Sequence, residues 1–168
     1  SDAVLLTSEV RKTEDSTARY AAWLARLREV CTQHGVPLIF DEVYTGFRLA
    51  PGGAQEFFGV RADVVVYGKT VAGGLPIGVV CGDHRFMKRF RDHRPADVCF
   101  ARGTFNSHPY VMAAMNEFLL HLDGPEMQDL YRDLDATWAR RTASLNRRLR
   151  ERELPLQIAD LSSIWTVC

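Results

Sequence analysis

Three short runs of apolar residues constrain the fold of this chain more than any other feature of its sequence. They occupy residues 37–41, 63–67 and 77–81, and Val, Ile and Leu dominate them. Continuous runs of this kind are typical of strands buried on both faces of a sheet that helices cover. Apolar residues at helical spacing precede the first run and follow the third. The order helix, strand, loop, strand, strand, helix predicts an α/β fold.

Helix and turn signals set the expected bounds of the other elements. Ser16 is a candidate N-cap for a first helix, and Gly35 stands where a helix end needs a left-handed residue. Apolar stripes predict a second helix over 111–122 and one long third helix over 127–149. The remaining expectations are a strand over 4–6, a short helix over 83–91, and a strand and turn over 156–168.

The composition is that of an ordinary globular protein, and it argues against several functional classes. The 168 residues carry 21 Lys and Arg against 21 Asp and Glu, and 46% are hydrophobic. This balance argues against disorder, general nucleic-acid binding and binding to a membrane surface, and no apolar run reaches the ~18 residues of a membrane span. The four cysteines and five histidines lack the spacing of a zinc site. We therefore expect no metal and a reduced, cytoplasmic setting.

The first candidate site residue is Asp41, at the end of the first apolar run. In open α/β sheets, ligands bind beyond the carboxyl ends of the strands. If extended geometry persists, Asp41 and Val43 point to the same side, because side chains repeat every second residue. One side of the chain would then offer a carboxylate beside an apolar contact. The alternative is an aspartate that caps a helix or turn.

The second candidate is Lys69, which directly follows the second run and precedes a glycine-rich turn. A lysine at such a position is a candidate for desolvation, which lowers its pKa and makes it nucleophilic. The alternative is an ordinary surface lysine. A phosphate loop of nucleotide hydrolases is excluded, because that motif needs a glycine five residues before Gly68. Asp63 stands there, and a strand replaces the flexible loop.

The third candidate is the loop over 102–109, which leads into the helix expected at 111–122. Gly, Thr, Asn and Ser ahead of a helix can bind an anion, because the helix begins with free N–H groups and the positive end of its dipole. The alternative is plain capping by Asn106 or Ser107. Pro109, near the first turn, is compatible with both interpretations.

Together these loops resemble class III aminotransferases, which depend on pyridoxal 5′-phosphate and have the fold-type I architecture. The similarity is to glutamate-1-semialdehyde 2,1-aminomutase and to aminotransferase domains embedded in megasynthases, and NSHP over 106–109 favours the megasynthase type. The motifs that carry it, in order, are LIFDEVYTGFR over 38–48, GAQ over 53–55, FGV over 58–60, YGK over 67–69, GGLPIG over 73–78 and GTF over 103–105.

The resemblance implies a role for five residues. Lys69 would be the catalytic residue, forming the Schiff base with the cofactor and moving the proton. Asp41 would pair with the pyridine nitrogen, Val43 would pack on one face of the ring, and Tyr44 would lie near the phenolic oxygen. Thr104 would bind the cofactor phosphate across the interface of a homodimer, in the partner's site.

The resemblance also implies a domain organisation and leaves several functions open. Residues 1–122 would be part of the cofactor-binding large domain, and 123–168 a linking helix with the beginning of a small C-terminal domain. Family members are two to three times longer, so we expect a fragment that is inactive alone. The leading function is amino-group transfer on a small-molecule substrate or a keto-acyl chain bound to a carrier protein. A glutamate-1-semialdehyde-type aminomutase and a non-catalytic dimerisation or binding fragment are the alternatives.

Overall fold

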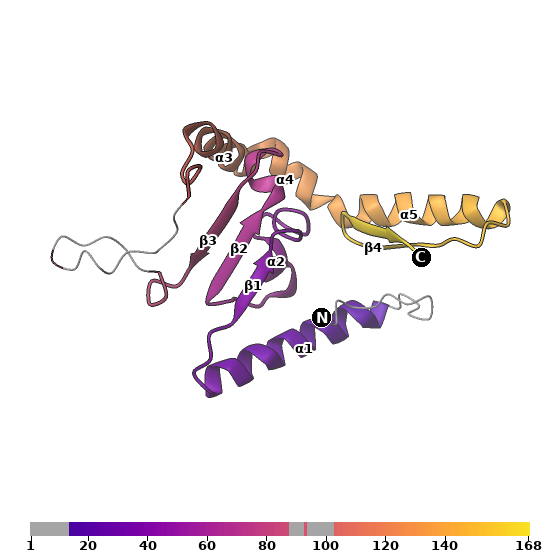
Figure 1. Cartoon of the computed structure of the whole chain (residues 1–168). Coiled ribbons are helices and arrows are strands. Elements are labelled where there is room, and N and C mark those ends of the chain that lie inside the picture. Colours follow the sequence, from indigo (N-terminus) through magenta and orange to yellow (C-terminus); the bar gives the residue numbers. More distant parts are fainter. Residues whose placement is uncertain (1–13, 88–92, 94–102) are drawn as a thin grey trace.

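The computed structural model describes residues 14–87, 93 and 103–168 (Figure 1). The strand expected over 4–6 lies outside these residues, as does the segment 88–91 of the helix expected over 83–91. The first part of this expected helix, over 83–87, is absent, because residues 84–86 form a turn. In this turn Asp83 accepts hydrogen bonds from Arg85 N through Oδ1, at 2.9 Å, and from Phe86 N through its carbonyl, also at 2.9 Å. A short polar side chain that binds nearby backbone in this way competes with helix formation.

A three-stranded sheet lies at the centre of the molecule (Figure 1). Its strands are β1 (Ile39–Glu42), β2 (Val64–Gly68) and β3 (Gly78–Gly82), in the order β1-β2-β3. β1 and β2 run parallel, with Asp41 opposite Val66, and β3 runs antiparallel to β2. The three apolar runs therefore form the predicted strands, each within about two residues of its expected bounds.

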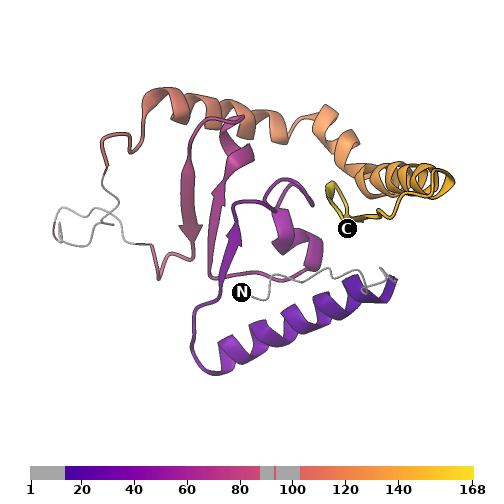
Figure 2. The same cartoon turned by 45° about the vertical axis from the view of Figure 1, so that its right-hand side comes forward.

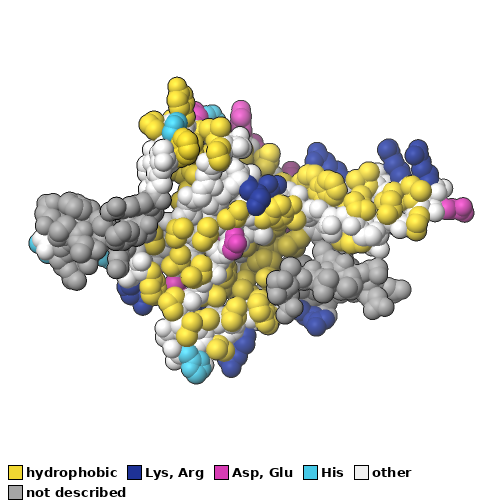
Figure 3. Space-filling view, viewed as in Figure 1, with side chains coloured by type: hydrophobic (Ala, Val, Ile, Leu, Met, Phe, Trp, Pro, Cys, Tyr) yellow, Lys and Arg dark blue, Asp and Glu magenta, His cyan; other side chains and the backbone are white. Residues whose placement is uncertain are grey.

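The expectation that these strands are buried on both faces is wrong for the described residues. Val65 in β2 is buried, but Ile39 in β1 is 60% exposed and Val80 in β3 is 56% exposed. Figure 3 shows hydrophobic side chains gathered on the molecular surface, many of them over the sheet. The buried apolar core is small because the described helices cover little of the sheet. Its members are Leu24, Leu38, Leu49, Val60, Val65, Val71 and Ala72.

Helix α1 (Glu14–Gln33) lies beside the end of the sheet at which β1 begins (Figures 1 and 2). It starts two residues before the predicted N-cap Ser16, but it ends as predicted, with Gly35 in the left-handed region at φ 64°. Arg28 Nη1 lies 2.6 Å from Asp63 Oδ2, which also accepts a hydrogen bond from Leu38 N at 2.8 Å. These contacts hold α1 to the start of β1 and β2.

The long helix predicted over 127–149 is two helices in the structure, α4 (Pro125–Arg132) and α5 (Leu134–Glu151). Asp133 separates them with φ −107° and ψ 9°, which is outside helical geometry. Its carbonyl still accepts the first hydrogen bond of α5, from Thr137 N at 2.9 Å. The apolar spacing continues across this residue, so the stripe alone does not reveal the break.

The remaining elements agree with the predicted pattern. Helix α3 (Pro109–Leu122) covers the predicted 111–122, and β4 (Ile158–Leu161) pairs antiparallel with β5 (Ile164–Val167). The amide of Asn146 in α5 exchanges two hydrogen bonds with the backbone of Ile158, at 2.8 and 2.7 Å. Helix α5 and this hairpin extend together away from the sheet (Figure 1). Within the described ranges, no helix is both long enough and apolar enough to cross a membrane.

Candidate active site

Asp41 and Lys69 lie at the carboxyl ends of neighbouring parallel strands. Asp41 is the third residue of β1 and pairs with Val66 of β2, and Lys69 follows β2 immediately. This is the edge of an α/β sheet at which ligands bind. Both side chains are exposed, so the expectation that Lys69 is desolvated is wrong for this chain. The reason is its position: the chain leaves the buried part of β2 before Lys69.

The carboxylate of Asp41 has one oxygen engaged by its own turn. Val43 N donates to Asp41 Oδ1 at 3.0 Å, as in the short turns that aspartate side chains commonly close. β1 ends at Glu42, so extended geometry does not persist to Val43 as the sequence argument assumed. Asp41 is therefore a turn aspartate, and its other oxygen has no hydrogen bond to any described residue.

Val43 still reaches the site, because it packs against the end of β2. A Cβ atom added to Gly68 would lie 3.2 Å from Val43 Cγ1 and 3.2 Å from the carbonyl oxygen of Ile77. These contacts are tight, so Gly68 is the residue that lets Val43 approach the backbone just before Lys69. Val43 is thereby placed against Gly68, the residue that precedes Lys69.

Lys69 begins the short 3-10 helix η1 (Lys69–Ala72) with φ 46°, in the left-handed region. A non-glycine residue in that region costs of the order of 1–3 kcal/mol, and such residues cluster at functional sites. The side chain lies over the ring of Tyr44, whose centroid is 5.6 Å from Lys69 Nζ. Tyr44 is itself 48% exposed.

The sequence analysis assigned no role to Arg48, but the structure places it on the same ring. Its guanidinium carbon Cζ lies 4.8 Å from the centroid of Tyr44, within the range of a cation–π interaction. Arg48 is half-buried. The sequence feature that could have pointed to Arg48 is its place in the 38–48 motif, four residues after Tyr44.

Glu42 is the second residue that the sequence analysis missed. Its side chain is 1% exposed, and its carboxylate accepts hydrogen bonds from Ala54 N at 2.6 Å, Gln55 N at 3.1 Å and Thr45 Oγ1 at 3.1 Å. Ala54 and Gln55 belong to the short helix α2 (Gly53–Phe58). A buried carboxylate is tolerated only with such partners, so Glu42 fixes the end of β1 against α2.

Gly53 completes this contact, since its φ is 71° and an added Cβ would collide with the carboxylate of Glu42. Tyr67 lies opposite Glu42 in the β1–β2 ladder. Burial raises the pKa of the Tyr67 hydroxyl, and the negative charge of Glu42 raises it further. The chain next to Asp41 is thus held by buried polar contacts.

The 43–50 loop, which follows β1, is also held by the residue next to Lys69. Thr70 Oγ1 donates to the carbonyl of Gly46 at 3.2 Å. Phe47 has φ 63°, and its ring centroid lies 5.2 Å from that of Tyr67 and 5.1 Å from that of Phe118 in α3. Phe47 therefore anchors the loop between the sheet and α3.

Two residues from the far end of the chain bind the next two carbonyls of this loop. Tyr131 OH, in α4, donates to Phe47 O at 2.7 Å, and Ser163 Oγ, between β4 and β5, donates to Arg48 O at 2.7 Å. These partners stand 84 and 115 residues away in sequence. No local pattern could have identified them. The C-terminal segment thus fixes the backbone that carries Arg48.

Thr104 does not join the other predicted site residues in the structure. It is exposed in the turn before α3, and it has no hydrogen bond to Asp41, Val43, Tyr44 or Lys69 within the described chain. The N-cap of α3 is His108 rather than Asn106 or Ser107, and Pro109 occupies the first helical position as expected. The role of Thr104 in a partner's site stays a prediction.

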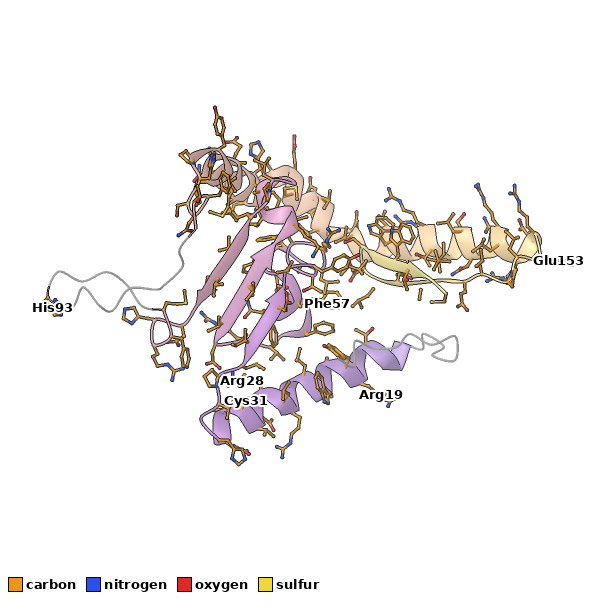
Figure 4. All side chains as sticks on the ribbon, viewed as in Figure 1. Arg19, Arg28, Cys31, Phe57, His93 and Glu153 are labelled. Carbon is orange, nitrogen blue, oxygen red and sulfur yellow. The ribbon has the colours of Figure 1, made fainter. Side chains whose placement is uncertain are left out.

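A cavity of about 700 Å³ lies elsewhere, between α1 and the sheet. Arg28, Cys31, Asp63 and Cys81 are among its lining residues, and none of the five predicted site residues lines it. Figure 4 shows Arg28 and Cys31 on α1, beside the start of β1. The described residues contain no group of three His, Cys, Asp or Glu side chains suited to a metal ion.

Comparison with known proteins identifies relatives of most of this chain. The family model described as "Aminotransferase class-III" matches residues 16–159. A curated glutamate-1-semialdehyde 2,1-aminomutase from Nitratidesulfovibrio vulgaris (strain Hildenborough) is 40% identical over 147 residues, which are 88% of this chain and 33% of that protein. The chain spans about a third or less of the length of the curated relatives it matches.

Solved structures show the same relationship. An omega-transaminase from Sphaerobacter thermophilus matches with a TM-score of 0.73 and 32% identity, over 88% of this chain and 32% of that chain. A second structure, described as a transaminase with pyridoxal phosphate bound, matches with a TM-score of 0.72 and 32% identity, over 87% and 33% of the two chains.

The residues at the strand ends fit pyridoxal phosphate chemically. The cofactor needs an amine for its aldehyde, a carboxylate for its pyridine nitrogen and an apolar contact for its ring. Lys69, Asp41 and Val43 supply these three groups from adjacent strand ends, and Gly68 leaves the space that Val43 requires. The arrangement can therefore hold the aldehyde and nitrogen sides of the ring.

Proposed function

The chain belongs to the class III aminotransferase family, and on that premise we propose that it is part of an enzyme that transfers amino groups with pyridoxal phosphate. Enzymes of this family depend on that cofactor, and a matching solved transaminase contains it. The observation that carries the proposal is the placement of Asp41 and Lys69 at the ends of neighbouring parallel strands.

Each site residue then has a defined task. When bound, pyridoxal phosphate withdraws electrons from the substrate carbon next to the reacting nitrogen. Lys69 would hold the cofactor aldehyde through Nζ and would carry the proton to and from the substrate carbon. Asp41 would keep the pyridine nitrogen protonated through the oxygen that its own turn leaves free. Val43 would pack against the ring, and Tyr44 borders Lys69.

An aminomutase of the glutamate-1-semialdehyde type is the second candidate. It is favoured by the curated relatives, which carry that name. An aminomutase and an aminotransferase make the same demands on Lys69 and Asp41, so the described residues support both. The carrier-bound keto-acyl substrate, the homodimer with Thr104 in the partner's site, and the cytoplasmic setting stay predictions.

The test is to trap the cofactor on the chain. The 168-residue chain and the longest natural polypeptide that contains it are incubated with pyridoxal phosphate, reduced with borohydride and digested for mass spectrometry. We expect the phosphopyridoxyl group on Lys69. It should be absent in Lys69→Ala and present in the matched control Lys88→Ala, which removes a different lysine.

The outcomes distinguish the functional classes. Label on Lys69 in both polypeptides supports a cofactor site that this chain forms itself. Label only in the longer polypeptide supports the same site, completed by residues beyond this chain. Equal label on all lysines, or none in either polypeptide, contradicts the proposal and favours the non-catalytic binding fragment.

A further inference from the structure

Helix α5 and its C-terminal end carry a concentration of positive charge. The chain as a whole has zero net charge, but residues 138–152 hold six arginines and a single acidic residue, Glu151. All six arginines are exposed, and within the described residues only Arg147 forms an ion pair, with Glu151 at 3.8 Å. Figure 3 shows basic side chains along one edge of this helix, with hydrophobic side chains beside them. The six are Arg140, Arg141, Arg147, Arg148, Arg150 and Arg152.

Two of these arginines alternate with two apolar residues along one side of α5. Residues at spacings of three and four lie on one face of a helix, and the same spacing forms the seam along which two helices pack in a coiled coil. Leu145 is 46% exposed, so its apolar surface is open to a partner. The four residues, spaced by three, four and three positions and termed the α5 stripe, are Trp138, Arg141, Leu145 and Arg148.

The α5 stripe is held in place by the neighbouring face of the helix. Thr142 is buried, and the Asn146 amide exchanges two hydrogen bonds with the backbone of Ile158, so α5 keeps a fixed orientation on the β4–β5 hairpin. Within the stripe, the guanidinium carbon of Arg141 lies 5.0 Å from the ring centroid of Trp138, in the range of a cation–π interaction. An arginine ordered in this way loses less entropy when it binds a partner.

We propose that the α5 stripe binds an acidic amphipathic helix of a partner protein. The partner places Glu or Asp side chains against Arg141 and Arg148, and an apolar side chain against Leu145. The local excess of arginine selects an acidic partner by charge complementarity. The recurrence of arginine and apolar residues at heptad spacing selects a helix, which docks through anchors at these positions.

The exposed apolar residue argues for a protein rather than another polyanion. Nucleic acids bind to arginines mainly through their phosphates, and such contacts make no use of Leu145. A helix that lies on a membrane presents a continuous apolar face, which Arg141 and Arg148 interrupt here. The inference does not depend on the cofactor chemistry proposed for Lys69.

The test measures the binding of a fluorescent helical peptide, by anisotropy, to the longest natural polypeptide that contains this chain. The peptide has about four heptads, with Leu at positions a and d and Glu at positions e and g, where repulsion between glutamates opposes pairing of the peptide with itself. One control peptide has Gln in place of every Glu, and a second has Ser in place of every Leu. A DNA duplex and phosphatidylserine vesicles are the competing probes.

The site variant combines Arg141→Gln with Arg148→Gln. Its matched control combines Arg19→Gln with Arg26→Gln, which removes two exposed arginines that also stand seven residues apart, on α1. We expect the site variant to bind the acidic peptide about threefold to thirtyfold more weakly, the range of two exposed ion pairs. The control variant should bind as the unchanged polypeptide does, both control peptides should bind more weakly, and added salt should weaken the binding.

Leu145→Gln is a second site variant, and it should also weaken binding of the acidic peptide because it removes the apolar contact. Circular dichroism checks that every variant is folded. The inference is overturned by equal affinities of the site and control variants, by absence of peptide binding to the unchanged polypeptide, or by equal binding of the acidic and the Gln peptide. Tighter binding of the DNA duplex or of the vesicles than of the acidic peptide also overturns it.

Discussion

Replacement of Glu42 by Gln should strongly destabilise the chain, because Glu42 is a buried acceptor of three hydrogen bonds. In Gln, one carboxylate oxygen becomes an NH2 group that must face either Ala54 N or Gln55 N, both of which are donors. One charge-assisted bond is lost, at about 1.5–3 kcal/mol, and a buried N–H stays unsatisfied. We expect the free energy of unfolding to fall by roughly 2–4 kcal/mol.

Glu56→Gln is the matched control. Glu56 also accepts a backbone hydrogen bond in this region, from Gly52 N at 2.6 Å, but its side chain is exposed. Water can replace that bond, so the loss should stay below about 1 kcal/mol. The assay is urea unfolding followed by circular dichroism and tryptophan fluorescence. An equal or smaller loss for Glu42→Gln than for Glu56→Gln would refute the assignment of Glu42 as a buried anchor.

Three further predictions follow, one from the contacts that hold α1 to the start of the sheet and two from contacts around the site. The hydrogen bond from Leu38 N and the Arg28 guanidinium lower the pKa of Asp63 below its ordinary 3.8. The ionised Asp63 therefore stabilises the fold fully above pH 3.8, and this stabilisation is lost as pH falls through the lowered pKa. Urea midpoints measured against pH should show the loss, and Asp63→Asn should abolish this part of the pH dependence. Ser163→Ala should lower the free energy of unfolding by about 1 kcal/mol and speed hydrogen exchange in residues 46–49. Unchanged exchange would refute the inference that Ser163 holds the backbone at Arg48. Gly68→Ala should cost about 1–3 kcal/mol in urea unfolding and reduce cofactor labelling of Lys69; full labelling would show that Val43 can move aside.

Local signals in the sequence predicted most of the fold. Continuous Val and Ile runs identified β2 and β3, and Gly35 identified the end of α1. The sequence placed Asp41 and Lys69 each at the end of an apolar run, and the structure adds that these two runs are neighbouring parallel strands. These inferences needed only short-range patterns.

Features that depend on distant contacts were not predictable in this way. Nothing in the Asp41–Glu42 pair indicates which carboxylate is buried, since the decision is made by N–H groups of α2, 12 and 13 residues further on. Arg48 is positioned by Ser163, 115 residues away. The break at Asp133 was missed because the apolar spacing continues across it.

The central claim is that Asp41 and Lys69 hold one cofactor, and the most direct test is the affinity of Asp41→Asn for pyridoxal phosphate. Asp83→Asn is the matched control, because Asp83 also accepts a hydrogen bond from the backbone N–H two residues on, at 2.9 Å against 3.0 Å for Asp41. Both variants are titrated with the cofactor in the longest natural polypeptide that contains this chain. Loss of the carboxylate at the pyridine nitrogen should weaken binding about tenfold to a hundredfold in Asp41→Asn and leave Asp83→Asn unchanged. Equal affinities in the two variants, with Lys69 still labelled, would show that Asp41 only closes its turn.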